Sequence, residues 1–105
     1  MEYPEKRRHT RLPVLIDCRV EGASGRVETR MTDLSPVGCF VDTMIPFSPN
    51  TEVTLYATLN GVEVPLSGRV IPMKQSGFGI GVEFTDLDDA TRKMLEAYIR
   101  EREST

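Results

Sequence analysis

The stretch that decides the fold is "EVTLYATLNGVEVPLSGRVI", residues 52–71. Apolar and polar residues alternate with period two on both sides of Asn60-Gly61, which is typical of half-buried strands. Asn-Gly is a strong hairpin signal, because a type I′ turn needs positive φ at both central residues. Pro65 is predicted to face solvent or to lie at a bulge. The residues predicted to face the core are Val53, Leu55, Ala57, Leu59, Val62, Val64, Leu66 and Val70. The stretch therefore predicts an antiparallel hairpin.

Similar patterns lie on both sides of this hairpin. The run that begins at Leu12 also has period two, and "GASG" (22–25) predicts a hairpin with a longer loop to the next strand. "CFVDT" (39–43) and "GFGIGVEF" (77–84) are predicted as further short strands. These strands add up to six.

One helix is predicted after the last strand, over residues 86–103, with Thr85 or Asp86 as its N-cap. The face predicted to be buried comprises Leu87, Ala90, Thr91, Met94, Leu95, Tyr98 and Ile99. Six short strands with hairpin connections close most easily as a small antiparallel barrel, with the helix covering an opening or edge. We therefore expect an all-β fold in one domain over residues 1–105, with a flexible arm (1–11), a barrel (12–84) and the helix.

Composition excludes several classes of protein. The 105 residues are 39% hydrophobic, and no apolar run approaches the length of a membrane-spanning helix. The N-terminus is charged where a secretory signal is apolar, so a soluble, cytoplasmic protein without membrane insertion is expected. Cys18 and Cys39 are predicted to be small buried hydrophobes, and with His9 as the only histidine no metal site is expected.

Positive charge is concentrated in "KRRHTR", residues 6–11. This segment carries +4 in a protein of net charge −3, which leaves −7 for the rest. A protein so acidic elsewhere would repel a long polyanion, which argues against duplex nucleic acid as a partner. The segment suits a small anionic ligand better.

Two short patterns could form such a site. Arg7 and Arg11 are four residues apart, and planar guanidinium groups engage phosphate or guanine acceptors in pairs. In "DLSPVG" (33–38), Asp33 can accept hydrogen bonds from guanine, and Gly38 allows a close backbone approach. Each pattern alone fits a simpler interpretation, a solvated terminus in one case and a plain turn in the other.

Together, in this order and about 20 residues apart, the two patterns resemble the signatures of PilZ domains, bacterial receptors for cyclic di-GMP. The resemblance extends over essentially the whole chain, including "GFGIGVEF" and the terminal helix. It implies a six-stranded antiparallel barrel of the split-barrel type with a C-terminal helix, which agrees with the pattern of strands.

The resemblance also implies roles for individual residues. Arg7 and Arg11 would bind the guanines and phosphates, and Arg8 beside them could add a phosphate contact or stack. The facing surface on the barrel would comprise Asp33, Ser35 and Gly38. His9 could approach the ligand, although a lone histidine on an arm is more often solvated and we favour that interpretation. Lys6 stands where many relatives carry a further arginine, so one planar cation is missing.

The resulting hypothesis is a switch without chemistry. Binding of cyclic di-GMP would order the arm on the barrel and change the surface seen by a downstream protein, in a monomer or weak homodimer. An enzyme is not expected, because the chain has no clustered nucleophile, base or metal ligands. The alternatives are a small barrel that binds single-stranded nucleic acid and a PilZ-like adaptor that has lost ligand binding.

Overall fold

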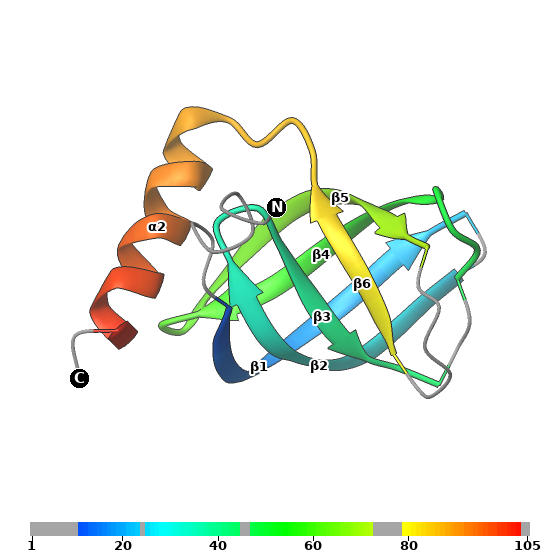
Figure 1. Cartoon of the computed structure of the whole chain (residues 1–105), viewed down its shortest axis with the longest axis horizontal. Coiled ribbons are helices and arrows are strands. Elements are labelled where there is room, and N and C mark those ends of the chain that lie inside the picture. Colours follow the sequence, from blue (N-terminus) through cyan, green and yellow to red (C-terminus); the bar gives the residue numbers. More distant parts are fainter. Residues whose placement is uncertain (1–10, 24, 45–46, 73–78, 104–105) are drawn as a thin grey trace, which may run out of the picture.

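The computed structural model describes residues 11–23, 25–44, 47–72 and 79–103. These residues form a closed antiparallel barrel in the strand order β1-β2-β3-β6-β5-β4 (Figure 1). The elements are β1 (Leu12–Gly22), β2 (Gly25–Ser35), β3 (Gly38–Asp42), β4 (Glu52–Leu59), β5 (Val62–Ile71), β6 (Ile80–Phe84) and α2 (Asp89–Glu103). The predicted all-β fold, with six strands and a C-terminal helix, is confirmed.

Two of the hairpin turns, β1–β2 and β4–β5, contain residues with positive φ. Asn60 has φ of 51° and Gly61 of 82°, as a type I′ turn requires, so the predicted β4–β5 turn is confirmed. The prediction of a longer loop between β1 and β2 was wrong, because pairing continues to Gly22 and Gly25 at the very end of the hairpin. Gly25, at φ of 139°, lies in a region that other residues rarely adopt and so permits this tight reversal.

The core fills the inside of the barrel with the inward-facing residues of each strand. Every predicted core residue of β4 is buried, as are Val64, Leu66 and Val70 of β5. Val62 was predicted to face inward, but it is 54% exposed because it lies next to the turn, at the end of the hairpin. Cys18 and Cys39 are buried free thiols, as predicted, and burial raises the pKa of Cys18 to about 11.

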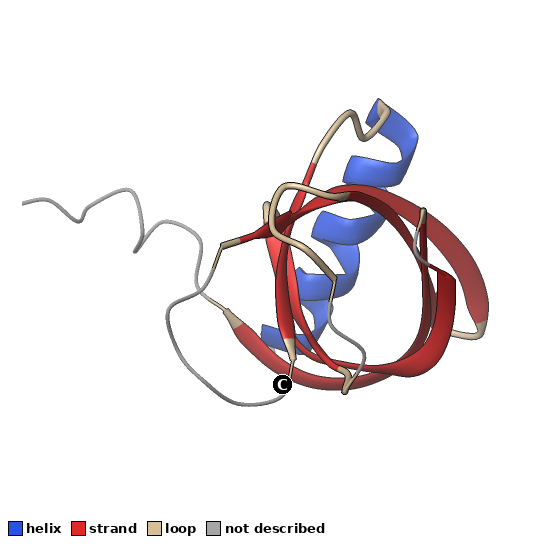
Figure 2. Ribbon diagram, turned by 90° about the vertical axis from the view of Figure 1, so that its right-hand side faces the viewer, coloured by secondary structure: helices blue, strands red, loops and turns tan. Residues whose placement is uncertain are grey.

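The helix α2 covers one end of the barrel, as the two perpendicular views show (Figures 1 and 2). Leu95, Tyr98 and Ile99 are buried in the core cluster, whereas Met94, predicted to be buried, is 45% exposed. Leu95 and Ile99 are four positions apart, so both lie on the face that meets the barrel, and Met94 lies at the edge of that face. Among the described residues, no helix is both long and apolar enough to cross a membrane.

The helix begins later than predicted, at Asp89 rather than Asp86. Asp86 has φ of 52°, which is outside the extended region that an N-cap residue adopts. The cap is Asp88, whose Oδ1 accepts a hydrogen bond of 2.7 Å from the amide of Thr91. This hydrogen bond lowers the pKa of the Asp88 carboxyl.

Strand β2 loses its regular alternation at Thr32. Met31 and Leu34 are both fully buried although they are three residues apart, which strict period two does not allow. The register shifts here on both sides, between Met31 and Asp33 against β3 and between Pro13 and Ile16 against β1. Such β-bulges change the direction in which the following side chains point.

Candidate functional site

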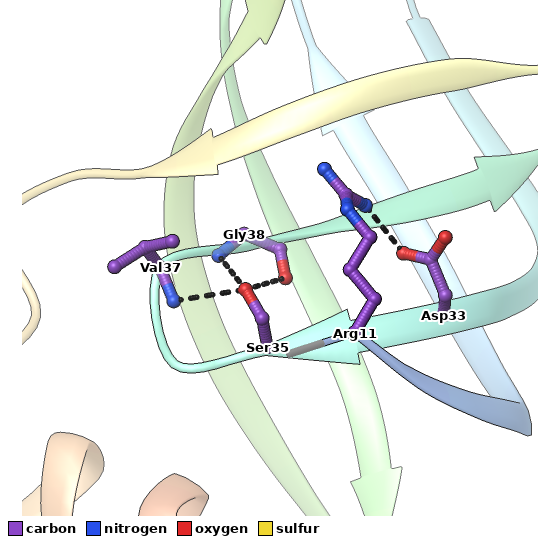
Figure 3. Close-up of polar contacts among 5 residues, drawn as sticks. All are labelled: Arg11, Asp33, Ser35, Val37 and Gly38. Carbon is purple, nitrogen blue, oxygen red and sulfur yellow. Dashed lines mark hydrogen bonds and ion pairs between the residues drawn. The ribbon is translucent and has the colours of Figure 1, made fainter. Parts of the chain in front are cut away.

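Arg11 and Asp33 form an ion pair on the outside of the barrel (Figure 3). Arg11 lies immediately before β1, and its Nη1 donates a hydrogen bond of 2.7 Å to Oδ1 of Asp33 on β2. The two strands are paired here, with Pro13 opposite Asp33. Side-chain exposure is 54% for Arg11 and 29% for Asp33, so both groups are accessible from solvent. The pair joins the two sequence patterns at one place.

The bulge in β2 accounts for the outward position of Asp33. With regular alternation, Asp33 would share a face with buried Met31 and would point into the core. Because the alternation slips at Thr32, Leu34 takes the inward position and Asp33 faces out beside Arg11. A buried, unpaired carboxylate would be very costly, so the slip also protects the stability of the barrel.

Ser35 holds the turn between β2 and β3 together. The amides of Val37 and Gly38 each donate to its Oγ at 3.2 Å, and its hydroxyl lies 3.3 Å from the Gly38 carbonyl, to which it donates (Figure 3). A hydroxyl has one donor and two acceptor positions, so these contacts use its full capacity. Ser35 is also 2% exposed, which makes it a structural part of this turn.

Gly38 is needed for packing inside the barrel. A Cβ added at this position would lie 2.5 Å from the carbonyl oxygen of Val82, a backbone atom of the neighbouring strand β6. No real Cβ sits that close to a backbone atom, and Gly38 is already paired to Glu83 in the sheet. The close approach that Gly38 permits in this structure is therefore that of β6.

Arg19, on the outside of β1, provides a comparison, because its hydrogen bonds and ring contact are with other residues of the barrel. Arg19 donates to Glu21 at 2.8 Å and to Glu63 at 3.2 Å, and its guanidinium lies 4.3 Å from the centre of the Tyr56 ring. The hydrogen bond to Glu21 raises the pKa of Arg19. Among the described residues, the ion pair of Arg11 is with Asp33 alone, which leaves other donors of its guanidinium for a ligand.

One surface hollow lies elsewhere on the barrel and has the wrong charge for an anion. It has a volume of about 670 Å³ and contains Arg19 and Tyr56. Its lining includes the carboxylates of Asp17, Glu28, Asp42 and Glu63 against the guanidinium groups of Arg19 and Arg30. This net negative charge disfavours a phosphate ligand. The Arg11–Asp33 pair is therefore the better candidate for binding an anion.

The structure places four of the seven predicted site residues. It brings Arg11 and Asp33 into contact, with Ser35 and Gly38 in the adjoining turn. Arg7, Arg8 and His9 lie outside the described residues. Within the part of the chain that is described, no three or more His, Cys, Asp or Glu residues gather as a metal site would require.

Sequence reasoning missed the bulge that positions this site. A signal was present, since Met31 and Leu34 are the apolar residues of "RMTDLS" and their spacing of three does not fit a regular strand. Neither sequence pattern includes the residues of β1 beside this bulge.

Comparison with protein families gives one match, to the PilZ domain over residues 5–101. No curated protein matches the sequence. The matched range covers both sequence patterns, the whole barrel and most of α2.

Several solved structures with the same fold cover nine tenths or more of this chain, among them the following three. The PilZ domain of CeSA from a cellulose-synthesizing bacterium is 24% identical, with a TM-score of 0.73 over 90% of this chain and 98% of its own. The PilZ domain of YcgR from Escherichia coli with c-di-GMP is 15% identical, with a TM-score of 0.76 over 94% of both chains. The inhibitor of motility MotI/DgrA from Bacillus subtilis is 15% identical, with a TM-score of 0.77 over 100% of this chain and 57% of its own. At these identities the likeness establishes the fold.

Proposed function

We propose, from the premise that this chain belongs to the PilZ domain family, that it is a receptor for cyclic di-GMP. The ligand is the one named with the E. coli YcgR domain, which has the same fold. PilZ domains are receptors and not enzymes, so binding is the activity to test.

The observation that carries this proposal is the Arg11–Asp33 contact of 2.7 Å. It joins the arginine pattern to the "DLSPVG" pattern although the two residues are 22 positions apart. A guanidinium can donate to phosphate oxygens or to the N7 and O6 atoms of guanine, and a carboxylate can accept from its N1 and N2 groups. The pair therefore offers both kinds of contact that a guanine nucleotide needs.

The charge of the ligand calls for more cations than this pair supplies. Arg11 and Asp33 together are neutral, whereas cyclic di-GMP carries two phosphate charges. The proposal assigns Arg7 and Arg8 to these phosphates, with Ser35 and Gly38 shaping the turn beside them and His9 as a further candidate. Ordering an arm of about six residues costs roughly 6–12 kcal/mol of backbone entropy, so several such contacts are required.

We infer that the protein signals by changing the surface that it presents to a downstream protein. Binding would change the conformation of the arm that precedes the barrel (12–84), so that the arm covers the face around Asp33 and presents a new surface to a downstream protein. The proposal includes a cytoplasmic setting and a monomer or weak homodimer as the acting form.

Calorimetric titration of the protein with cyclic di-GMP tests this proposal, because it reports affinity and stoichiometry together. The matched variants are Asp33→Ala and Asp17→Ala, which each remove an exposed carboxylate paired with an arginine on the outside of the barrel. We expect Asp33→Ala to weaken binding at least tenfold and Asp17→Ala to leave it unchanged.

Other outcomes would favour the alternatives. A parent protein that does not bind cyclic di-GMP but binds a protein partner would point to an adaptor. Tighter binding of short single-stranded RNA or DNA would point to a nucleic-acid-binding barrel. Equal effects of the two aspartate variants would contradict the assignment of the site.

A further inference from the structure

Leu15 is an exposed leucine on the outside of β1, close to the proposed site. Its side chain is 70% exposed, whereas Ile16 beside it is buried. On the outward row of β1 it follows Arg11 and Pro13 and precedes Asp17, where the row becomes charged. A single exposed leucine needs no explanation in itself, but this one stands on the same face as the Arg11–Asp33 pair.

The bulge between β1 and β2 lies at this residue. Pairing passes from Pro13–Asp33 directly to Ile16–Met31, so Val14 and Leu15 together face the single residue Thr32. Bulges are common beside functional sites, where they redirect a side chain. Leu15 is thereby a diagonal cross-strand neighbour of Asp33, a relation in which Cβ atoms lie within about 8 Å.

The purine rings of the ligand have apolar faces that an apolar side chain could cover. Arg11 and Asp33 offer charge and hydrogen bonds, which act on phosphates and on the edges of guanine. The flat faces of the purine remain to be covered. An isobutyl group next to Asp33 can cover the face of a base whose edge that carboxylate holds.

We propose that Leu15 is a ligand-contacting residue that packs on the face of a guanine of cyclic di-GMP. The proposal rests on the proposed function and adds to it a residue outside both sequence patterns. Removing about 50 Å² of apolar surface from water at about 25 cal/mol per Å² corresponds to roughly an eightfold gain in affinity.

The test compares cyclic di-GMP titrations of the full chain and its variants Leu15→Ser, Leu15→Phe and Met44→Ser. Met44 is the matched control, because it is 76% exposed and follows β3 at the end away from Asp33. We expect Leu15→Ser to weaken binding about eightfold, Leu15→Phe to bind within threefold of the parent, and Met44→Ser to bind as the parent does. Melting temperatures of all variants should stay close to that of the parent, since neither side chain is buried.

Salt dependence separates this apolar contact from a change in the charged site. The loss on Leu15→Ser should be the same at 50 mM and 500 mM NaCl, whereas the loss on Arg11→Ala should shrink as salt rises. Parent-like affinity of Leu15→Ser, or equal losses in Leu15→Ser and Met44→Ser, would overturn this inference alone. A parent that does not bind at all would overturn the proposed function and this inference with it.

Discussion

The two halves of "DLSPVG" differ in what they contact. Asp33 faces outward and pairs with Arg11, and both side chains are accessible to solvent. Ser35 and Gly38 are buried, and their contacts are with the turn and with the backbone of β6. A single short pattern thus combines Asp33, which can bind a ligand, with Ser35 and Gly38, which hold the adjoining backbone in position. Variants in the two halves should therefore separate affinity from stability.

The largest expected effect is on stability, from Gly38→Ala. The new Cβ would lie 2.5 Å from the Val82 carbonyl, and the β3–β6 pairing prevents that atom from moving away. We expect the free energy of unfolding to fall by about 3 kcal/mol, the upper end of overpacking costs, measured by urea denaturation. Gly61→Asn is the control, since its site is open and asparagine tolerates positive φ. A barrel as stable as the parent after Gly38→Ala would remove the structural explanation for this glycine.

The second effect is on affinity, from Arg11→Ala. Loss of a charge-assisted contact should weaken cyclic di-GMP binding about 30-fold, which corresponds to about 2 kcal/mol. Stability should change by less than about 0.5 kcal/mol, because the pair with Asp33 is exposed. Arg30→Ala, which removes another exposed arginine of an ion pair on the same barrel, should leave binding unchanged. If Arg11→Ala caused a large loss of stability and left binding unchanged, Arg11 would have a structural role instead of a role in ligand binding.

Ser35→Ala should act mainly on stability, and less strongly than Gly38→Ala. The amides of Val37 and Gly38 would lose their acceptor, at a cost of about 1.5 kcal/mol in thermal or urea unfolding. Ser67→Ala, at an exposed serine of β5, should have almost no effect. If Ser35→Ala lowered affinity far more than stability, Ser35 would belong with Asp33 in direct contact with the ligand.

The smallest effect concerns Asp88, an exposed carboxylate that caps a helix and has no part in the proposed site. Its pKa is lowered in the folded protein by the hydrogen bond from Thr91, so its contribution is present above the unfolded pKa of about 4 and is lost as pH falls through the folded pKa. We expect the melting temperature of the parent to fall slightly more than that of Asp88→Asn between pH 5 and pH 3. Asparagine keeps the capping oxygen without titrating, so equal pH profiles would contradict this explanation.

Local patterns predicted most of the fold because they depend on neighbouring residues. The Asn60-Gly61 turn and the inward faces of β4 and β5 follow from backbone sterics and from period two. Val62 and the first turn of the helix were predicted wrongly, because both lie at the ends of elements. There, burial and capping depend on parts of the chain that are distant in sequence.

The candidate site was predictable in part. Arg11, Asp33, Ser35 and Gly38 were predicted from their order and spacing, and in the structure Arg11 contacts Asp33 while Ser35 and Gly38 form the adjoining turn. Which of these residues face solvent and which are structural was not predictable. The close packing at Gly38, for example, depends on β6, which lies more than forty residues further along the chain. The sequence patterns also carried no mark that set Leu15 apart from other apolar residues of its strand.

The sequence by itself determined the periodicity of β4 and β5, the Asn60-Gly61 turn, the amphipathic helix and the concentration of positive charge in residues 6–11, because each follows from residue type and spacing. Only the tertiary structure decided that Asp33 faces outward, that Arg11 reaches it, and that Ser35 is fully hydrogen-bonded in its turn. The physical reason is the closure of the barrel. Six strands must share one interior, and the slip at Thr32 that brings Leu34 into this interior also turns Asp33 toward solvent.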